Sequence, residues 1–219
     1  MAAAPWIVSD DLWELVQPLL PKKERRFRYP GRRRLPERET LQGILFVLHT
    51  GISWTHLPRE LGFGSGITSW RRLDEWQKAG VWVELHEVLL TRLRAAGEIE
   101  WSRAVADSTN AGEKGGAETG PSPVDRGRAG SKHHLLVDAT GIPLAWSVTG
   151  GNRNDVTQLI PLVDAVPAVR GTVGRPRKRP ERVGCANSVF PATNPSRPSG
   201  QFTHPTRLRL VGPRAHRLG

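Results

Sequence analysis

Asp107 is the residue whose position first suggests chemistry. It closes an apolar run and is followed at once by small polar residues and glycines, in the stretch RAVADSTNAGEKGG (residues 103–116). A carboxylate at the end of a strand can hold a divalent cation, because the strand fixes the side chain while the loop beyond it admits substrate. Metal-dependent phosphoryl transfer needs two or three such carboxylates around a pair of Mg²⁺ ions. The alternative is an Asx turn, in which Asp107 accepts a hydrogen bond from the amide of Ser108 or Thr109.

Other polar side chains give weaker signals. Lys132, His133 and His134 stand together on an apolar run, but they lack the spacing of a metal site, and strand alternation turns one histidine inward and the other outward. Asp138 lies in the expected turn DATGIP and Asp155 at the start of an expected helix, so we predict a structural turn residue and a helix cap. The glycines that follow Asp107 match neither GxGxxG nor GxxxxGK[ST], which excludes these nucleotide-binding loops.

The net charge of +11 suggests a polyanionic partner, but it is unevenly spread. Residues 1–170 hold 22 Lys and Arg against 20 Asp and Glu, whereas residues 171–219 hold 10 against the single Glu181. The global charge therefore describes mainly the end of the chain. One local cluster, KKERRFRYPGRRR (residues 22–34), is either a solvated linker or an arm that contacts phosphates, because arginine pairs well with phosphate oxygens.

The elements that must position these side chains begin with helices. Ser9 is a suitable N-cap for the first, and Gly51 stops the second. Thr68 or Ser69 is the expected cap of a later, basic helix, SWRRLDEWQKAG. Apolar spacing and turn residues predict helices over 9–20, 36–50, 53–61, 69–80 and 81–97.

Short helices with a glycine-bearing turn before a basic helix are typical of the helix-turn-helix, although small helical bundles share this pattern without binding DNA. In the basic helix, Trp70, Leu73 and Trp76 form the expected inward stripe, and the cations lie off it. The candidate DNA-binding residues are Ser69, Arg71, Arg72 and Lys78 of this helix and Arg32, Arg33 and Arg34 of the basic cluster.

From about residue 99 the apolar period becomes that of strands. The runs IEWSRAVADS, SKHHLLVDAT and IPLAWSVTGG predict three strands, of which the last two form an antiparallel hairpin. Residues 110–131 form an expected loop, and NDVTQLIPLVDAV predicts a helix capped by Asn154 or Asp155 and kinked at Pro161. Together with the helices before them, these elements predict an α+β fold.

The residues after Val183 have a different character. Residues 184–219 hold five prolines and no acidic residue, and they show no sustained periodicity, so we expect disorder. A single cysteine excludes an internal disulfide framework. No apolar run approaches the ~20 residues of a membrane span, and the N-terminus lacks the features of a signal peptide, so we expect a cytoplasmic protein without a membrane partner.

The order of several motifs resembles a known family. The segments GISWTHLPRELGFGSGITSWRRLDEWQKAGVW, DST, GSKHHLLVDATGIPLAWSVTGGNRNDVTQLIPLVDAV and GRPRKRPERV are similar to bacterial insertion-sequence transposases of the DDE class, and more narrowly to the insertion sequence five family. The resemblance covers residues 6–183. It implies a helical region, residues 1–97, that recognises double-stranded DNA at the transposon ends, and a ribonuclease-H-like catalytic domain that begins at residue 98. Asp107 then matches the first member of an Asp-Asp-Glu triad that binds two Mg²⁺ ions. We also expect a homo-oligomer.

The chain departs from this family after RPERV. The family continues into a strand that ends in an Asp-Arg-Gly-Tyr type motif, and later carries the glutamate, whereas this chain reads GCANSV and has no acidic residue after Glu181. We therefore expect a partial catalytic domain over 98–183 and a disordered tail over 184–219. The loss of acids and the excess of proline and arginine indicate a frameshift near Val183. A truncated and inactive transposase is the leading hypothesis. The alternatives are a DNA-binding fragment that inhibits the intact enzyme and an unrelated helix-turn-helix regulator.

Overall fold

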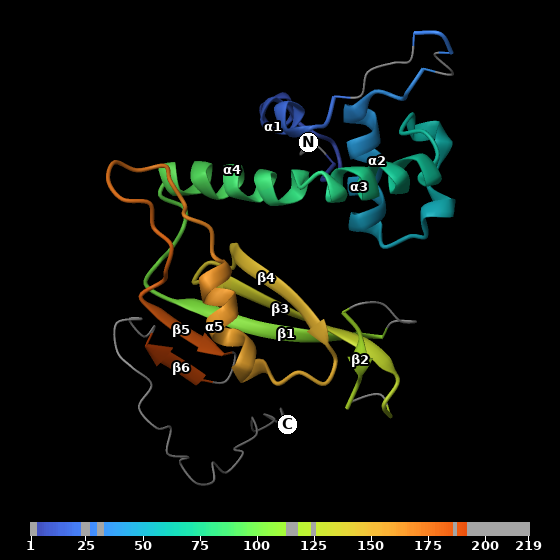
Figure 1. Ribbon diagram of the computed structural model, residues 1–219. Helices are drawn as coiled ribbons and strands as arrows, with labels where there is room; N and C mark the ends of the chain where they lie inside the picture. Colours follow the sequence, from blue (N-terminus) through green and yellow to red (C-terminus); the bar gives the residue numbers. More distant parts are fainter. Residues whose placement is uncertain are drawn as a thin grey trace, which may run out of the picture.

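The computed structural model describes residues 4–22, 27–29, 33–112, 118–123, 126–185 and 188–191. It shows an α+β protein in which a helical unit precedes a mixed sheet (Figure 1). The helices are α1 (Asp10–Val16), α2 (Glu37–Thr50), α3 (Gly66–Lys78), α4 (Val81–Ala95) and α5 (Asp155–Ala165), with short 3₁₀ turns η1 (Gln17–Leu19), η2 (Trp54–His56) and η3 (Arg59–Leu61). The strands are β1 (Ala104–Gly112), β2 (Gly120–Pro121), β3 (Ala129–Asp138), β4 (Pro143–Gly150), β5 (Arg182–Cys185) and β6 (Ser188–Pro191).

The first two helices begin and end where their sequence signals predict. The Ser9 hydroxyl accepts a hydrogen bond from the amide of Leu12 and so caps α1. Gly51 ends α2 in the left-handed conformation, with φ of 69°, which a glycine adopts without steric cost. The predicted helix over 53–61 is instead the two 3₁₀ turns η2 and η3.

The start of α3 differs from the prediction. Its N-cap is Ser65, whose hydroxyl accepts from the amide of Thr68, so Thr68 and Ser69 lie inside the helix. Gly66 is the reason that the helix can begin here. A Cβ atom at Gly66 would lie 1.5 Å from the carbonyl oxygen of Trp54 in η2, so only glycine fits.

The buried face of α3 also differs from the prediction. Trp76 is fully buried in the helical core, but Trp70 is 50% exposed, so the predicted stripe is wrong at that position. The inward row includes Ser69 and Arg72, which are 0% and 4% exposed. Other core residues around Trp76 are Val8, Val16, Leu20, Leu41, Ile44 and Val81.

The sheet is built around β1, which pairs antiparallel with β3 and parallel with β5. β4 pairs with the other edge of β3, and the two form the predicted hairpin. β1 begins later than expected and continues past Asp107 to Gly112, because the whole strand stays paired with β3. The predicted loop over 110–131 is therefore wrong at both ends, since β3 already begins at Ala129.

The helix α5 covers one face of the sheet (Figure 1). Leu162 of α5 packs in one cluster with Ala104, Leu136 and Leu144 of the strands. On the opposite face, Leu135 of β3 pairs with Trp146 of β4, and these two side chains and Val148 are much more exposed. The sheet thus has one buried face and one partly open apolar face.

The helix α4 joins the two units. Val81 at its start belongs to the core of the helical unit, whereas Leu90 belongs to the core of the sheet. Between them, the His86 ring lies 4.8 Å from that of Trp146 in an edge-on contact, and its Nε2 is 2.9 Å from the carbonyl oxygen of Pro143. The boundary expected at residue 97 follows the end of α4, but part of that helix packs with the sheet.

We expected disorder from residue 184 onward, but the first residues after Val183 belong to strands. β5 continues to Cys185, and β6 pairs with it antiparallel. The rest of the expected tail, residues 192–219, lies outside the described residues. None of the helices in the described part of the chain has both the length and the apolar character needed to cross a bilayer.

Candidate functional site

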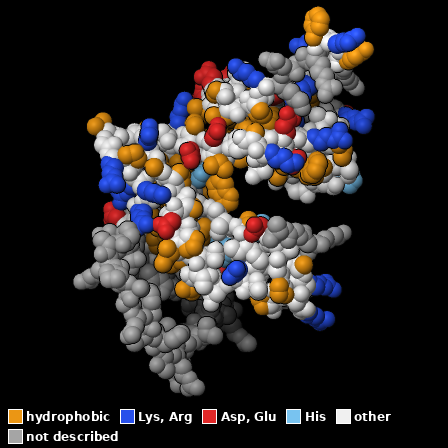
Figure 2. Space-filling model, viewed as in Figure 1, with side chains coloured by type: hydrophobic (Ala, Val, Ile, Leu, Met, Phe, Trp, Pro, Cys, Tyr) orange, Lys and Arg blue, Asp and Glu red, His pale blue; other side chains and the backbone are white. Residues whose placement is uncertain are grey.

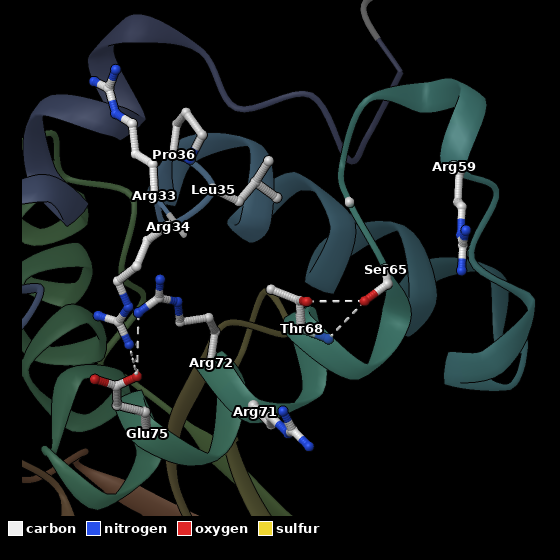
Figure 3. A pocket seen from close by; sticks show the side chains of 11 residues that line it. Arg33, Arg34, Leu35, Pro36, Arg59, Ser65, Thr68, Arg71, Arg72 and Glu75 are labelled. Carbon is white, nitrogen blue, oxygen red and sulfur yellow. Dashed lines mark hydrogen bonds and ion pairs between the residues drawn. The ribbon is translucent and has the colours of Figure 1, made fainter. Parts of the chain in front are cut away.

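A broad hollow on the helical unit gathers five arginines. Its volume is about 970 Å³, and Figure 2 shows Lys and Arg side chains over the part of this unit that carries α2 and α3. The hollow is lined by the segment before α2, by η3 and by the first turns of α3 (Figure 3). Its charged residues are Arg33, Arg34, Arg59, Arg71, Arg72 and Glu75. Five cations against one carboxylate make this hollow attractive to anions.

Two of these arginines share the carboxylate. Nη2 of Arg34 lies 2.6 Å from Oε2 of Glu75, and Nη1 of Arg72 lies 3.2 Å from the same oxygen. Burial lowers the pKa of Arg72, and the neighbouring Arg34 lowers it further, while Glu75 opposes both effects. A guanidinium remains charged despite such a shift, so the carboxylate stabilises a nearly buried cation.

The predicted DNA-binding residues do not all lie together. Arg33, Arg34, Arg71 and Arg72 line the hollow. Lys78 lies outside it and pairs with Asp74 at 2.7 Å, and Arg32 lies outside the described residues.

The prediction that Ser69 binds DNA is wrong. Ser69 is fully buried and faces α2, where its Oγ would lie 2.9 Å from a Cβ atom on Gly43. Such a side chain does not reach DNA. Arg59 was missed by the sequence reasoning. Its signal is weak, since it stands alone in a short segment between Pro58 and Gly62, and only the fold brings it to the hollow.

Asp107 lies within β1 rather than at its end, but it directly follows the last residue paired with β5, Ala106. Its side chain is exposed, and its Oδ1 accepts a 2.8 Å hydrogen bond from the amide of Ser108. This contact with the next residue resembles the local interaction offered as the alternative, but β1 continues as a strand here, so no Asx turn forms. Among the described residues, no three His, Cys, Asp or Glu side chains gather closely enough to hold a metal ion.

The neighbouring carboxylate, Asp155, is not the helix cap that the sequence predicted. Asn154 caps α5 by accepting from the amide of Val156, and Asp155 turns back to the sheet. Its Oδ1 lies 2.8 Å from Nζ of Lys132 and 2.8 Å from Oγ of Ser108. Burial raises the pKa of Asp155, but the hydrogen bonds from Lys132 and Ser108 outweigh it and the net shift is downward.

The two histidines of β3 point to opposite faces, as alternation predicts. His134 is buried, with Nδ1 3.6 Å from Oδ1 of Asp155 and Nε2 2.8 Å from Oγ1 of Thr149. Burial lowers its pKa, so the ring is neutral near pH 7. His133 is exposed and lies 2.9 Å from the hydroxyl of Ser131. These contacts connect strands and helix, and no third potential metal ligand joins His134 and Asp155 among the described residues.

Asp138 has the structural role expected of it. Its buried carboxylate accepts hydrogen bonds from the amides of Glu100, Thr140 and Ile142. Burial raises its pKa, but these hydrogen bonds hold the pKa below its usual value. The residue therefore fixes the β3–β4 turn and the chain that leads into β1.

Comparison with known proteins supplies the identity of both units. Residues 8–86 match the family described as putative transposase of IS4/5 family, and residues 94–178 match the transposase DDE domain. The chain is 56% identical over 105 residues to an insertion element IS402 uncharacterized 16.2 kDa protein of Burkholderia cepacia, a match that covers 48% of this chain and 71% of that protein.

It is also 58% identical over 69 residues to a putative transposase for insertion sequence element IS402 of the same organism. This match covers 32% of the chain and 33% of that transposase. No solved structure matches the chain. The resemblance seen in the sequence is thereby confirmed, and the chain belongs to the IS4/5 family of insertion-sequence transposases.

Proposed function

We propose that this chain binds duplex DNA at the ends of an insertion sequence through its helical unit. The observation that carries the proposal is the hollow with five arginines and one glutamate beside α3. Arginine contacts to phosphate position a protein on duplex DNA and give most of its electrostatic affinity. The family supports the same conclusion, because a putative transposase is among the relatives.

The arrangement of α2 and α3 supports a helix-turn-helix reading. The two helices contact each other, and the segment between them contains the turns η2 and η3. The outer face of α3 exposes Ile67, Trp70 and Arg71. We propose that this face enters the major groove, where apolar and arginine side chains contact base edges.

The sheet supports a ribonuclease-H-like reading of the second unit. Three strands, β1, β3 and β4, run antiparallel in sequence, and α5 then leads to β5, which pairs parallel with β1. In this reading Asp107 is the first of the three carboxylates that hold Mg²⁺ in the family. One exposed carboxylate is insufficient for two ions.

Within the part of the chain that the structure describes, the remaining carboxylates do not supply the missing ligands. Asp155 is engaged by Lys132 and Ser108, and Ser108 alternates with Asp107, so the two aspartates serve opposite faces of β1. β5 carries no carboxylate, and no Asp or Glu occurs after Glu181. The residues present therefore do not fit a pair of Mg²⁺ ions, and we propose that this chain binds DNA without cleaving it.

Inhibition of an intact transposase is the second candidate function. A DNA-binding unit joined to a sheet that lacks the second and third carboxylates would occupy the element ends without reacting. The hypothesis of an unrelated regulator is wrong, because the chain belongs to the transposase family.

Binding to the DNA that flanks the gene tests the proposal. The full chain should bind a duplex that contains the flanking inverted repeat at least tenfold more tightly than a shuffled duplex, a modest ratio for specific binding. Equal affinity for both duplexes would contradict end recognition, and absence of binding at low salt would contradict DNA binding itself. For the second candidate, added chain should reduce end cleavage by an intact transposase of the same element.

A further inference from the structure

Glu75 pairs with two arginines at the hollow, and these arginines differ in how far their side chains are exposed to water. Arg72 and Glu75 are both in α3, three residues apart, whereas Arg34 comes from the segment before α2. Figure 3 shows both guanidinium groups turned towards the carboxylate of Glu75. A single oxygen, Oε2, receives both, at 2.6 Å from Arg34 and 3.2 Å from Arg72.

The pairing with Arg72 is the permanent one. The Arg72 side chain is only 5% exposed, and a buried cation that loses its carboxylate is strongly destabilising. The Arg34 side chain is 38% exposed, so water can solvate it and it loses little by leaving the carboxylate. Of the two arginines, Arg34 is therefore the one that can change partner.

The hollow can bring a phosphate to Arg34 as its new partner. Arg33, Arg59 and Arg71 line it and have no carboxylate partner among the described residues. A phosphate attracted by these cations would come close to the pair formed by Arg34 and Glu75. Guanidinium groups bind carboxylate and phosphate with the same forked geometry, so a phosphate can replace Glu75 as the acceptor for Arg34.

We infer that Glu75 competes with the DNA backbone for Arg34: in the free protein Arg34 is held by Glu75, and on duplex binding it transfers to a phosphodiester, while Glu75 stays with Arg72. This rests on the proposed DNA binding and adds to it a residue that sets the affinity. Glu75 stabilises α3 through Arg72, and its contact with Arg34 lowers the affinity of the protein for DNA.

The test measures affinity for a mixed-sequence duplex of about 30 base pairs as a function of NaCl concentration, using the full chain. Arg34→Gln leaves the Arg72–Glu75 pair intact and should weaken binding about three- to tenfold near 0.1 M salt, with a salt slope shallower by about 0.9. Arg103→Gln is the matched control, since Arg103 is exposed on the sheet unit, and it should change neither quantity.

Glu75→Gln should tighten duplex binding roughly two- to fivefold, because Arg34 is then free in the unbound protein. A double-variant cycle separates this effect from the mere loss of a negative charge. The gain from Glu75→Gln should be largely absent in the Arg34→Gln background. An equal gain in both backgrounds would overturn the inference, since charge alone would explain it. Thermal unfolding monitors whether Glu75→Gln still folds, and if it does not, an unchanged affinity and salt slope in Arg34→Gln would still overturn the inference.

Two further outcomes keep the inference distinct from the proposed function. If the wild-type chain binds the duplex and Arg34→Gln leaves the affinity and the salt slope unchanged, DNA binding stands and the competition is wrong. If inorganic phosphate displaces the duplex more than chloride does at equal ionic strength, and Arg34→Gln removes none of this excess, the phosphate site lies elsewhere and the competition at Arg34 is overturned.

Discussion

The hydroxyl of Ser108 donates a 2.8 Å hydrogen bond to Oδ1 of Asp155. This contact ties the strand β1 to the first residue of α5, and Lys132 of β3 approaches the same oxygen at 2.8 Å. Ser108 also donates its amide to Oδ1 of Asp107. One residue thus links the exposed carboxylate of the sheet to the helix on its other face.

Asp155→Asn should lower the free energy of unfolding by about 1 kcal/mol or less at pH 7, because the side chain is half exposed and water screens its ion pair. The pKa of Asp155 is lowered in the fold, so its contribution is complete above the ordinary value of 3.8 and is lost as the pH falls further. The difference in unfolding midpoint between wild type and variant should therefore shrink below about pH 4.

Asp11→Asn is the control for this pH profile. Asp11 is also exposed in the first turn of a helix, so both substitutions remove a favourable charge near a helix N-terminus, but Asp11 forms no ion pair within the described part of the chain. If the two variants lose stability equally at every pH, the contacts of Asp155 with Lys132 and Ser108 add no stability beyond that of a charge at a helix N-terminus.

Leu90→Ala should destabilise the protein by about 2–5 kcal/mol, the cost of a cavity in a packed core. Leu90 is 1% exposed and packs with the sheet although it lies in α4. Val83→Ala, at an exposed position of the same helix, should cost well under 1 kcal/mol. Denaturant unfolding followed by circular dichroism measures both. Similar small losses would mean that α4 does not contribute to the core of the sheet.

Gly66→Ala should destabilise the helical unit by at least 1–3 kcal/mol, because an added methyl group meets the backbone of Trp54 and η2 must move. The displacement should also weaken duplex binding, since α3 begins at this residue. Gly112→Ala is the matched control, as open space surrounds the position of its Cβ. A stable Gly66→Ala variant with unchanged DNA affinity would show that α3 tolerates a different start.

Magnesium or manganese should leave the thermal midpoint and supercoiled plasmid DNA unchanged, because the described residues form no metal-binding group. Asp107→Asn should behave as the wild type in both assays. Metal-dependent nicking that disappears in Asp107→Asn would demonstrate a working site and contradict the proposed lack of cleavage.

The helices could be predicted largely from local signals. The caps Ser9 and Gly51 bond to residues three and four positions away in the chain, Leu12 and Val47, so their effect is visible in the local sequence. The start of α3 could not be predicted in this way, because Gly66 begins the helix through a contact with Trp54. That contact depends on how the turn η2 packs, which no local pattern encodes.

The candidate sites show the same division. The basic residues near Arg33 and Arg71 are evident in the sequence, but the burial of Ser69 and Arg72 depends on the rotation of α3. Asp155 was predicted as a helix cap, since Asn and Asp are common there. Its actual partners come from β1 and β3, and their approach requires the folded sheet.

The parallel pairing of β1 with β5 has a consequence for synthesis. Ala104 pairs with Val183, far along the chain, through only three residue pairs, whereas β1, β3 and β4 follow one another as local antiparallel partners. A nascent chain can form these three strands before β5 leaves the ribosome, because local contacts close first. During that interval the edge of β1 at Ala104–Ala106 stays open, and an open strand edge is where a chain pairs with a neighbour on the same polysome.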